Sequence, residues 1–333
     1  MRKILWATIS VALISIVFEG CKEKEESIPK YNVQFVATEG GTIEGESGEY
    51  EEGEWLSFNA IPNDGYYFDQ WCDGNVYSKS YLIVEKDTTI TATFKKKTIT
   101  TVDLGLESGN LWATCNLGAY RPWDYGDYYA WGETETKEMY GSSNYKYWIY
   151  SDVKWLDSLK LTKYCHKAKY GKDGFVDSLT TLQPEDDAAT AVWGTEYSTP
   201  TVDDWAELVN QCYLVYTHDY YGHKGIIVFK AKSDSDKGAR GENNKLIDTP
   251  SESYTLSDPH IFIPFAGWRE RVKGALNSGC SGRYWSASLR GNPHQAYNFA
   301  FDDYYTGPRC YLDVKGYDEY RQRGFSIRPI RRK

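Results

Sequence analysis

The feature that most constrains the fold is the shortness of the apolar runs. Along most of the chain, runs of a few apolar residues alternate with clusters of Gly, Asn and Asp, as at residues 225–229, 260–264 and 296–301. Runs of this length match β-strands and are too short for helices that pack on a core. The sequence therefore predicts an α+β fold with many short strands, long loops and few helices.

Two stretches carry helix signals. From Pro184, a proline and three acidic residues form a first turn that suits the helix dipole, and Gly194 is the expected stop. Thr201 to Asp204 resembles a capping box, with Asp in the position that Glu or Gln usually holds. One helical face follows, made of Trp205, Leu208, Val209 and Cys212.

The N-terminus has the layout of an export signal. Arg2 and Lys3 precede residues 4–18, which carry no charge. At about 1.5 Å per residue this run spans about 22 Å, short of the ~30 Å hydrocarbon core of a bilayer. The pattern therefore favours a cleaved signal over a permanent membrane span.

Gly20-Cys21 at the end of this run resembles the lipobox of bacterial lipoproteins, in the loose form found in Bacteroidota. Phe18 and Glu19 depart from the usual lipobox, and an acidic stretch after Cys21 looks like a surface-export signal. The resemblance implies a signal peptide at 1–20, lipidation of Cys21, a charged tether at 21–30, and lipid anchoring to the outer membrane with surface exposure. The alternative is a cleaved secretory peptide in which Cys21 is an incidental thiol.

Composition narrows the class of partner. The formal net charge of −9 argues against a nucleic-acid partner, because phosphates favour Lys and Arg. A mean hydropathy of −0.61 excludes a polytopic membrane protein. Aromatic residues make up 16% of the chain, so Tyr and Trp are the natural candidates for ligand contacts. We therefore expect membrane attachment only through the lipid, and no cofactor.

Residues 31–97 form a small β-rich module in the sequence pattern. Strand-like alternation at 33–37, 56–60 and 90–94 surrounds the turn signal Pro62-Asn63-Asp64-Gly65. The module resembles the bacterial repeat related to the internalin B repeat, through GGT at 40–42, AIPNDGY at 60–66, FDQW at 68–71 and DTTITATF at 87–94. That resemblance implies a β-grasp-like spacer on a bacterial surface protein, with no catalytic residues.

Residues 101–331 resemble the Fibrobacter succinogenes major paralogous domain. The blocks that carry the resemblance are VDLGL at 102–106, LWATCNLGA at 111–119, YGDYYAWGE at 125–133, DDAAT at 186–190, PFAGWR at 264–269, YWSAS at 284–288 and SIRP at 326–329. This chain departs from the family at Tyr197-Ser198-Thr199, where Trp-Arg-Met is usual, and in a polar insertion at 233–253. The family is similar in pattern to C-type-lectin-like and formylglycine-generating-enzyme folds, so the resemblance implies such an α+β scaffold for display at the cell surface.

Apart from Cys21, six cysteines remain, and six allow fifteen full pairings. The boundary near residue 100 leaves Cys72 on one side and the other five on the other side. Either one bridge joins the two domains or at least two thiols stay free. We expect mainly buried structural thiols, with one or two disulfides.

No catalytic motif occurs in the sequence. It contains no GxSxG, P-loop or HExxH pattern, and its histidines are scattered. Acidic residues in a polar loop offer calcium candidates at Asp302, Asp303 and Asp313, although such residues are usually only solvated. We therefore predict neither an enzyme nor a metal site.

Exposed aromatic and arginine side chains in loops are the predicted ligand contacts. Aromatic rings can stack on sugars, and guanidinium groups can hydrogen-bond to hydroxyls or carboxylates. The predicted contacts are Tyr220, Tyr221, Arg269, Arg271, Tyr304, Tyr305 and Tyr311. We expect a surface lipoprotein with a lectin-like binding or adhesion domain, whose ligand is a glycan or a surface protein. The alternative is a structural subunit of a fimbria or envelope complex, and an enzyme is the third reading.

Overall fold

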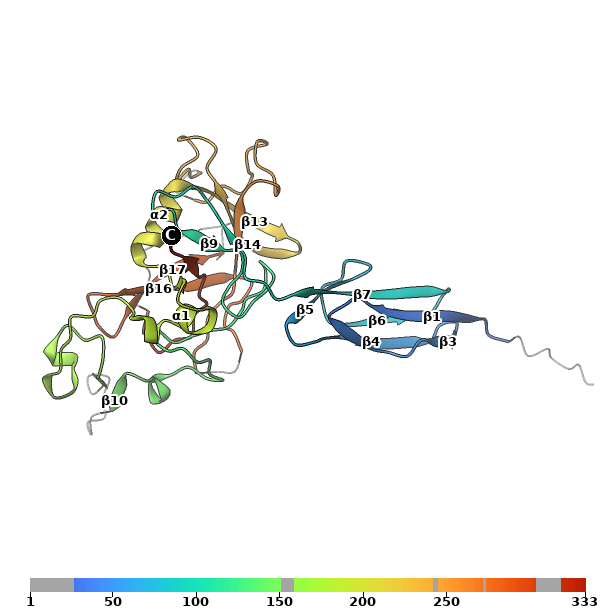
Figure 1. Ribbon diagram of the computed structural model, residues 1–333, viewed down its shortest axis with the longest axis horizontal. Helices are drawn as coiled ribbons and strands as arrows, with labels where there is room; N and C mark the ends of the chain where they lie inside the picture. The colour runs from blue at the N-terminus through green and yellow to red at the C-terminus, as the bar shows by residue number, and fades with distance from the viewer. Residues whose placement is uncertain (1–26, 151–158, 242–244, 272–273, 304–318) are drawn as a thin grey trace, which may run out of the picture. The chain divides into compact units, whose positions relative to one another are not determined.

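The computed structural model describes residues 27–150, 159–241, 245–271, 274–303 and 319–333 (Figure 1). The expected signal peptide, Cys21, Tyr304, Tyr305, Tyr311 and Asp313 lie outside the described residues. The chain divides into two compact units, residues 1–96 and 97–333. Among the described residues, no helix is both long enough and apolar enough to cross a bilayer.

The first unit consists of two sheets. Its strands, blue to cyan in Figure 1, are β1 (Lys30–Ala37), β2 (Gly41–Glu44), β3 (Gly48–Glu51), β4 (Trp55–Pro62), β5 (Tyr66–Trp71), β6 (Lys79–Ile83) and β7 (Thr88–Lys96). One sheet has the order β3-β1-β7-β5 and the other β2-β4-β6, and only the β1–β7 pairing is parallel. Residues 27–96 contain no helix, so the β-grasp likeness expected from the sequence is limited to the strands.

The core of the first unit follows the period-2 alternation of its strands. Phe58, Ile90 and Ala92 point inward and are buried, as their alternation predicts. Trp71 is 2% exposed, and its indole Nε1 donates a hydrogen bond to the Tyr77 carbonyl at 2.8 Å. This tryptophan is therefore a core residue.

The second unit is built from small sheets. Its strands are β8 (Thr101–Val102), β9 (Leu111–Ala113), β10 (Trp148–Tyr150), β11 (Leu159–Leu161), β12 (Tyr197–Ser198), β13 (Cys212–Tyr220), β14 (His223–Lys230), β15 (His260–Pro264), β16 (Ser281–Leu289), β17 (Ala296–Asp302) and β18 (Ile330–Arg331). They pair in the orders β12-β18-β9-β8, β13-β14-β15, β16-β17 and β10-β11. β18, near the end of the chain, lies between β9 and β12, so distant segments share one sheet.

The helices of the second unit are short. In the described part of this unit they are the α-helices α1 (Ala188–Trp193) and α2 (Val202–Gln211), with the 3₁₀ turns η1 (Ser142–Asn144), η3 (Ala168–Tyr170), η4 (Lys172–Gly174) and η5 (Pro184–Asp186). One core cluster includes Trp205, which stacks on Phe299 with ring centroids 4.4 Å apart. A second cluster includes Trp131 and Trp285. Trp131, Trp205 and Trp285 thus lie in the interior of the second unit.

The capping box predicted at the start of α2 is confirmed. Thr201 Oγ1 accepts a hydrogen bond from the Asp204 backbone N–H at 3.1 Å, and an Asp204 side-chain oxygen accepts one from the Thr201 N–H at 2.7 Å. Trp205, Leu208 and Val209 are buried on the predicted face. The helix ends at Gln211, so Cys212 begins β13 and does not extend that face.

The helix predicted from Pro184 is in fact two pieces. The 3₁₀ turn Pro184–Asp186 ends at Asp187, whose backbone is extended, and α1 begins at Ala188. Asp187 breaks the run because its carboxylate accepts a hydrogen bond from the Ala189 N–H, which makes it the N-cap of the second piece. Gly194 ends α1 as predicted, at a φ of 103°.

The expectation of one or two disulfides is wrong for the cysteines that the structure describes. Cys72, Cys115, Cys165, Cys212 and Cys280 are free thiols, of which Cys72 and Cys280 are exposed. Burial raises the pKa of the Cys115 and Cys165 thiols, and it raises that of Cys212 to about 12. The three buried thiols act as small apolar side chains.

Candidate functional site

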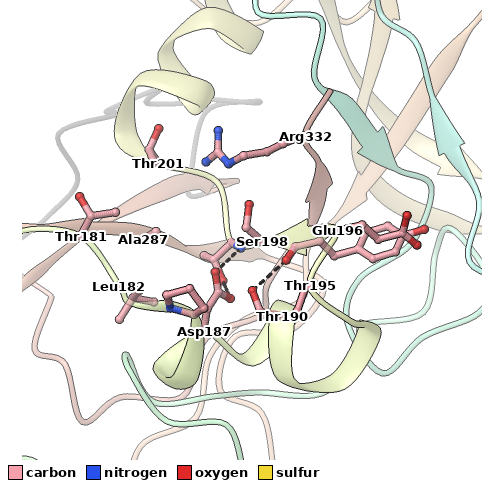
Figure 2. A pocket seen from close by; sticks show the side chains of 13 residues that line it. Thr181, Leu182, Asp187, Thr190, Thr195, Glu196, Ser198, Thr201, Ala287 and Arg332 are labelled. Carbon is pink, nitrogen blue, oxygen red and sulfur yellow. Dashed lines mark hydrogen bonds between the residues drawn. The ribbon is translucent and has the colours of Figure 1, made fainter.

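A cavity of about 490 Å³ opens in the second unit, beside α1, β12 and the start of α2 (Figure 2). Its volume lies in the range of sites for small molecules. Most of the lining side chains are short and many carry a hydroxyl. They are Thr181, Leu182, Pro184, Asp187, Thr190, Thr195, Glu196, Tyr197, Ser198, Thr199, Thr201, Ala287 and Arg332.

Asp187 and Thr199 form a rigid part of the cavity wall. The Asp187 carboxylate accepts hydrogen bonds from the Thr199 hydroxyl at 2.6 Å and from the Thr199 backbone N–H at 2.8 Å. Burial raises the pKa of Asp187, and these hydrogen bonds oppose that rise. Because the carboxylate also caps α1, its role is to fix the wall in place.

Ser198 supplies a polar atom that the protein leaves unused. Its Oγ is buried and has no hydrogen-bond partner among the described residues. The neighbouring Thr190 hydroxyl is already engaged, since it donates to the Tyr197 carbonyl at 2.8 Å. A buried hydroxyl without a partner costs free energy, so a group that enters the cavity and bonds to Ser198 would recover it.

Besides Asp187, two charged side chains stand at the cavity. Glu196 is exposed, and Arg332 reaches in from a different side, near Thr201 (Figure 2). Arg332 Nη2 donates to Asp204 at 3.2 Å, which uses only part of the five N–H groups of a guanidinium. The cavity therefore offers hydrogen-bond donors and acceptors together.

Of the predicted ligand-contact residues, the four that the structure describes do not line this cavity. Tyr220 is 6% exposed, stacks on Phe262 with centroids 4.1 Å apart, and shares a hydrogen bond of 3.0 Å with His260. Burial raises the pKa of Tyr220 to about 12. Tyr220 is thus held in the interior, with no exposed ring for a ligand.

Tyr221, in contrast, is 63% exposed at the tip of the β13–β14 hairpin. Its φ of 52° is unusual for a bulky residue, and Gly222 follows with a φ of 83°. The ring lies 5.1 Å from that of Trp123, which also stacks on His223 at 5.9 Å. Burial lowers the pKa of His223.

The two predicted arginines differ in exposure and in their contacts. Arg269 stacks its guanidinium 4.9 Å above the Tyr128 ring, and its backbone pairs with Gly324. Arg271 is exposed, with its backbone N–H bonded to the Tyr140 carbonyl at 2.8 Å. Of the two, only Arg271 presents its side chain freely to solvent.

The calcium candidates in the described residues are engaged by protein cations. Asp302 pairs with Arg283 at 3.0 Å, whereas Asp303 accepts from Tyr216 at 2.8 Å and Lys224 at 3.3 Å. No group of three metal-ligating side chains occurs in the part of the chain that the structure describes. Asp313 lies outside that part.

Sequence reasoning missed Ser198, Glu196 and Arg332. The one available signal was Tyr197-Ser198-Thr199, where this chain departs from the family-like pattern. Arg332 lies near the end of the chain, and nothing local in the sequence places it beside residues more than one hundred positions earlier.

Of the comparisons with known proteins, one gives a match, and it falls in the first unit. Residues 31–98 match the family model of the divergent InlB B-repeat domain. No curated protein and no solved structure matches the chain. The match covers the segment where the sequence predicts a bacterial repeat module, and it supports a bacterial repeat domain there.

Proposed function

We propose that the second unit binds an uncharged carbohydrate in the cavity beside Ser198, and that the protein is a binding protein without catalytic activity. The observation that carries the proposal is the buried, unpartnered Ser198 Oγ in a hydroxyl-lined cavity of about 490 Å³. A cavity of this size takes a ligand of one or two sugar rings, and such a ligand would supply the missing partner.

The mixture of donors and acceptors favours hydroxyl groups on the ligand. Arg332 offers N–H donors and Glu196 offers carboxylate acceptors, while Ser198 can do either. A sugar hydroxyl both donates and accepts, so it can satisfy all three. An anionic ligand would meet the carboxylates of Glu196 and Asp187 and is disfavoured.

The cellular setting is part of the proposal and rests on sequence alone. Cys21 in a lipobox-like context supports a lipid-anchored protein of the outer membrane, exposed at the cell surface. The blocks in residues 101–331 support a Fibrobacter succinogenes major paralogous domain with a lectin-like scaffold. The β-rich first unit and the few helices of the second are compatible with that arrangement. A protein anchored in this way that binds a glycan on another surface would act in adhesion.

A glycan array tests the proposal with the whole chain and two cavity variants. Ser198→Ala removes the unpartnered hydroxyl, and Glu196→Gln keeps size while removing the charge. We expect defined neutral glycans to bind, with affinity falling about fivefold in the first variant and about tenfold or more in the second. Glu252→Gln, an exposed change away from the cavity, is the matched control and should bind normally.

Two results would overturn the assignment. A blank array would exclude carbohydrate as the ligand. Hits that disappear with Tyr221→Ala but persist with Ser198→Ala would move the site to the aromatic hairpin tip. Mass spectrometry of the bound glycans checks the absence of catalysis, because a released fragment would indicate an enzyme.

A further inference from the structure

The first unit exposes a stacked aromatic pair. Trp55 on β4 is 59% exposed and Tyr81 on β6 is 63% exposed, and their rings stack with centroids 4.5 Å apart and planes 11° apart. Ile83, the direct partner of Trp55 across the two strands, is 44% exposed. Three large apolar side chains therefore adjoin on the outer face of the β2-β4-β6 sheet.

This exposure is not a consequence of a shifted register. Leu56 and Phe58 on β4, and Leu82 on β6, point to the opposite face and pack in the core of the unit. Strand alternation then places Trp55 and Tyr81 outward, where polar residues such as Ser57 would be expected. An adjoining group of exposed apolar side chains on a small domain is typical of an interaction surface.

The charge of the unit indicates what kind of partner fits. Residues 31–98 contain twelve acidic residues and five lysines, with no arginine, which gives a net charge of −7. Glu54 directly precedes Trp55, and its carbonyl accepts a hydrogen bond from the Val84 N–H, next to Ile83. Glu44 lies on β2 of the same sheet, bonded to Asn59. The unit that carries the aromatic pair is therefore strongly acidic as a whole, which favours a cationic partner over an anionic one.

We propose that this face binds an arginine-rich segment of a protein partner. A guanidinium group stacks on the faces of Trp and Tyr, and the net negative charge of the unit attracts it. The proposal is independent of the carbohydrate cavity, since all its residues belong to the first unit.

Two other occupants fit the face less well. A second copy of the unit would bring another charge of −7 against it, so electrostatic repulsion opposes self-association. A sugar chain binds best to aromatic rings that lie flat side by side on the protein surface. Trp55 and Tyr81 instead stack on each other, so each covers one face of the other ring. Each ring has only its outer face left for a ligand, which suits a planar cation.

The test measures the binding of fluorescent nona-arginine and nona-lysine peptides to the whole chain by fluorescence anisotropy. We expect nona-arginine to bind more tightly than nona-lysine, and the double variant Trp55→Ala/Tyr81→Ala to weaken nona-arginine binding at least tenfold. The single variant Trp55→Phe keeps Tyr81 and an aromatic ring at position 55. It should therefore bind nona-arginine more tightly than the double variant does. Tyr77→Ala is the matched control, because Tyr77 is 72% exposed in the same unit and its side chain is absent from the stacked pair.

Several outcomes would overturn the proposal. Nona-arginine binding that is absent, equals that of nona-lysine, or survives the double variant would show that the aromatic pair does not recognise a guanidinium. Sedimentation that reveals a dimer abolished by the double variant would assign the face to a second copy. Two results together would establish the proposal. The parent chain binds nona-arginine more tightly than nona-lysine, and the double variant loses this binding while its unfolding temperature stays unchanged.

Discussion

Arg321 donates a hydrogen bond from Nε to the Tyr145 hydroxyl at 2.9 Å, and both side chains are buried. Other N–H groups of the guanidinium bond to the Pro293 carbonyl at 2.8 Å and the Tyr164 carbonyl at 3.2 Å. The Trp131 ring lies 4.7 Å from the guanidinium carbon. Arg321 therefore joins four segments that are far apart in the sequence.

The first prediction concerns this buried guanidinium. Arg321→Lys should lower the free energy of unfolding by about 3 kcal/mol, because a lysine cannot fill the fork of donors and leaves buried carbonyls without partners. Denaturant unfolding followed by tryptophan fluorescence measures the change. Arg271→Lys, on an exposed arginine, should stay within about 0.5 kcal/mol of the parent chain. Equal effects of the two substitutions would contradict the structural role of Arg321.

The second prediction concerns pH. Burial opposes ionisation of Asp186, but hydrogen bonds outweigh it and lower the pKa from 3.8 to about 2. The donors are Lys163, Tyr147, Tyr164 and Lys146. Because the pKa is lower in the folded chain, ionised Asp186 stabilises the fold above about pH 4, and this stabilisation is lost as the pH falls towards 2.

Asp186→Asn tests that linkage. The variant should be roughly 2 kcal/mol less stable at pH 7, since its amide is a poor acceptor for two lysines. Its stability should also fall less steeply than that of the parent chain between pH 4 and pH 2. Unfolding free energies measured across this range give both quantities, and parallel pH profiles would refute the linkage.

The third prediction compares two glycines with positive φ. A Cβ on Gly267 (φ 67°) would lie 2.1 Å from the Leu276 carbonyl oxygen, whereas one on Gly222 (φ 83°) meets nothing within 4 Å. Gly267→Ala should therefore cost about 3 kcal/mol, from backbone strain and overpacking, and Gly222→Ala about 1 kcal/mol from strain alone. Thermal unfolding of the two variants measures the difference. A smaller loss at Gly267 than at Gly222 would exclude the close approach.

The fourth prediction concerns the thiols. In a Cys21→Ser/Cys310→Ser background, a water-soluble aromatic disulfide reagent should modify two thiols of the folded chain, Cys72 and Cys280, and all five after unfolding. Cys115 and Cys212 are buried, and their raised pKa keeps them protonated, so they should not react with the reagent in the folded chain. Fewer than five reactive thiols in denaturant without reductant would indicate a disulfide among these five.

Local signals in the sequence predicted many of the elements. Alternation located β1, β4 and β7, and the Thr201 capping box located the start of α2 to the residue. These features depend on hydrogen bonds and side-chain faces within a few residues of each other. The break at Asp187 was missed: its carboxylate caps Ala189 and is also held by Thr199, twelve residues later, a contact that the local pattern does not show.

The candidate sites were less predictable for the same reason. Tyr220 and Tyr221 are adjacent and look alike in the sequence, yet one is 6% exposed and the other 63%. Trp55 could have been found, since the inward positions assigned to Leu56 and Phe58 place it on the outer face. Ser198 could not, because its significance depends on the cavity around it.

The sequence by itself determined the class of fold, the bacterial repeat module and the local caps and turns, since each is set by interactions between near neighbours in the chain. Only the tertiary structure decided which side chains meet. The cavity at Ser198 is lined by residues from Thr181 to Arg332, and Arg321 is enclosed by Trp131, Tyr145 and Tyr164. Alternation fixes the face on which a side chain lies, but the segment that covers that face is chosen by packing across the whole unit.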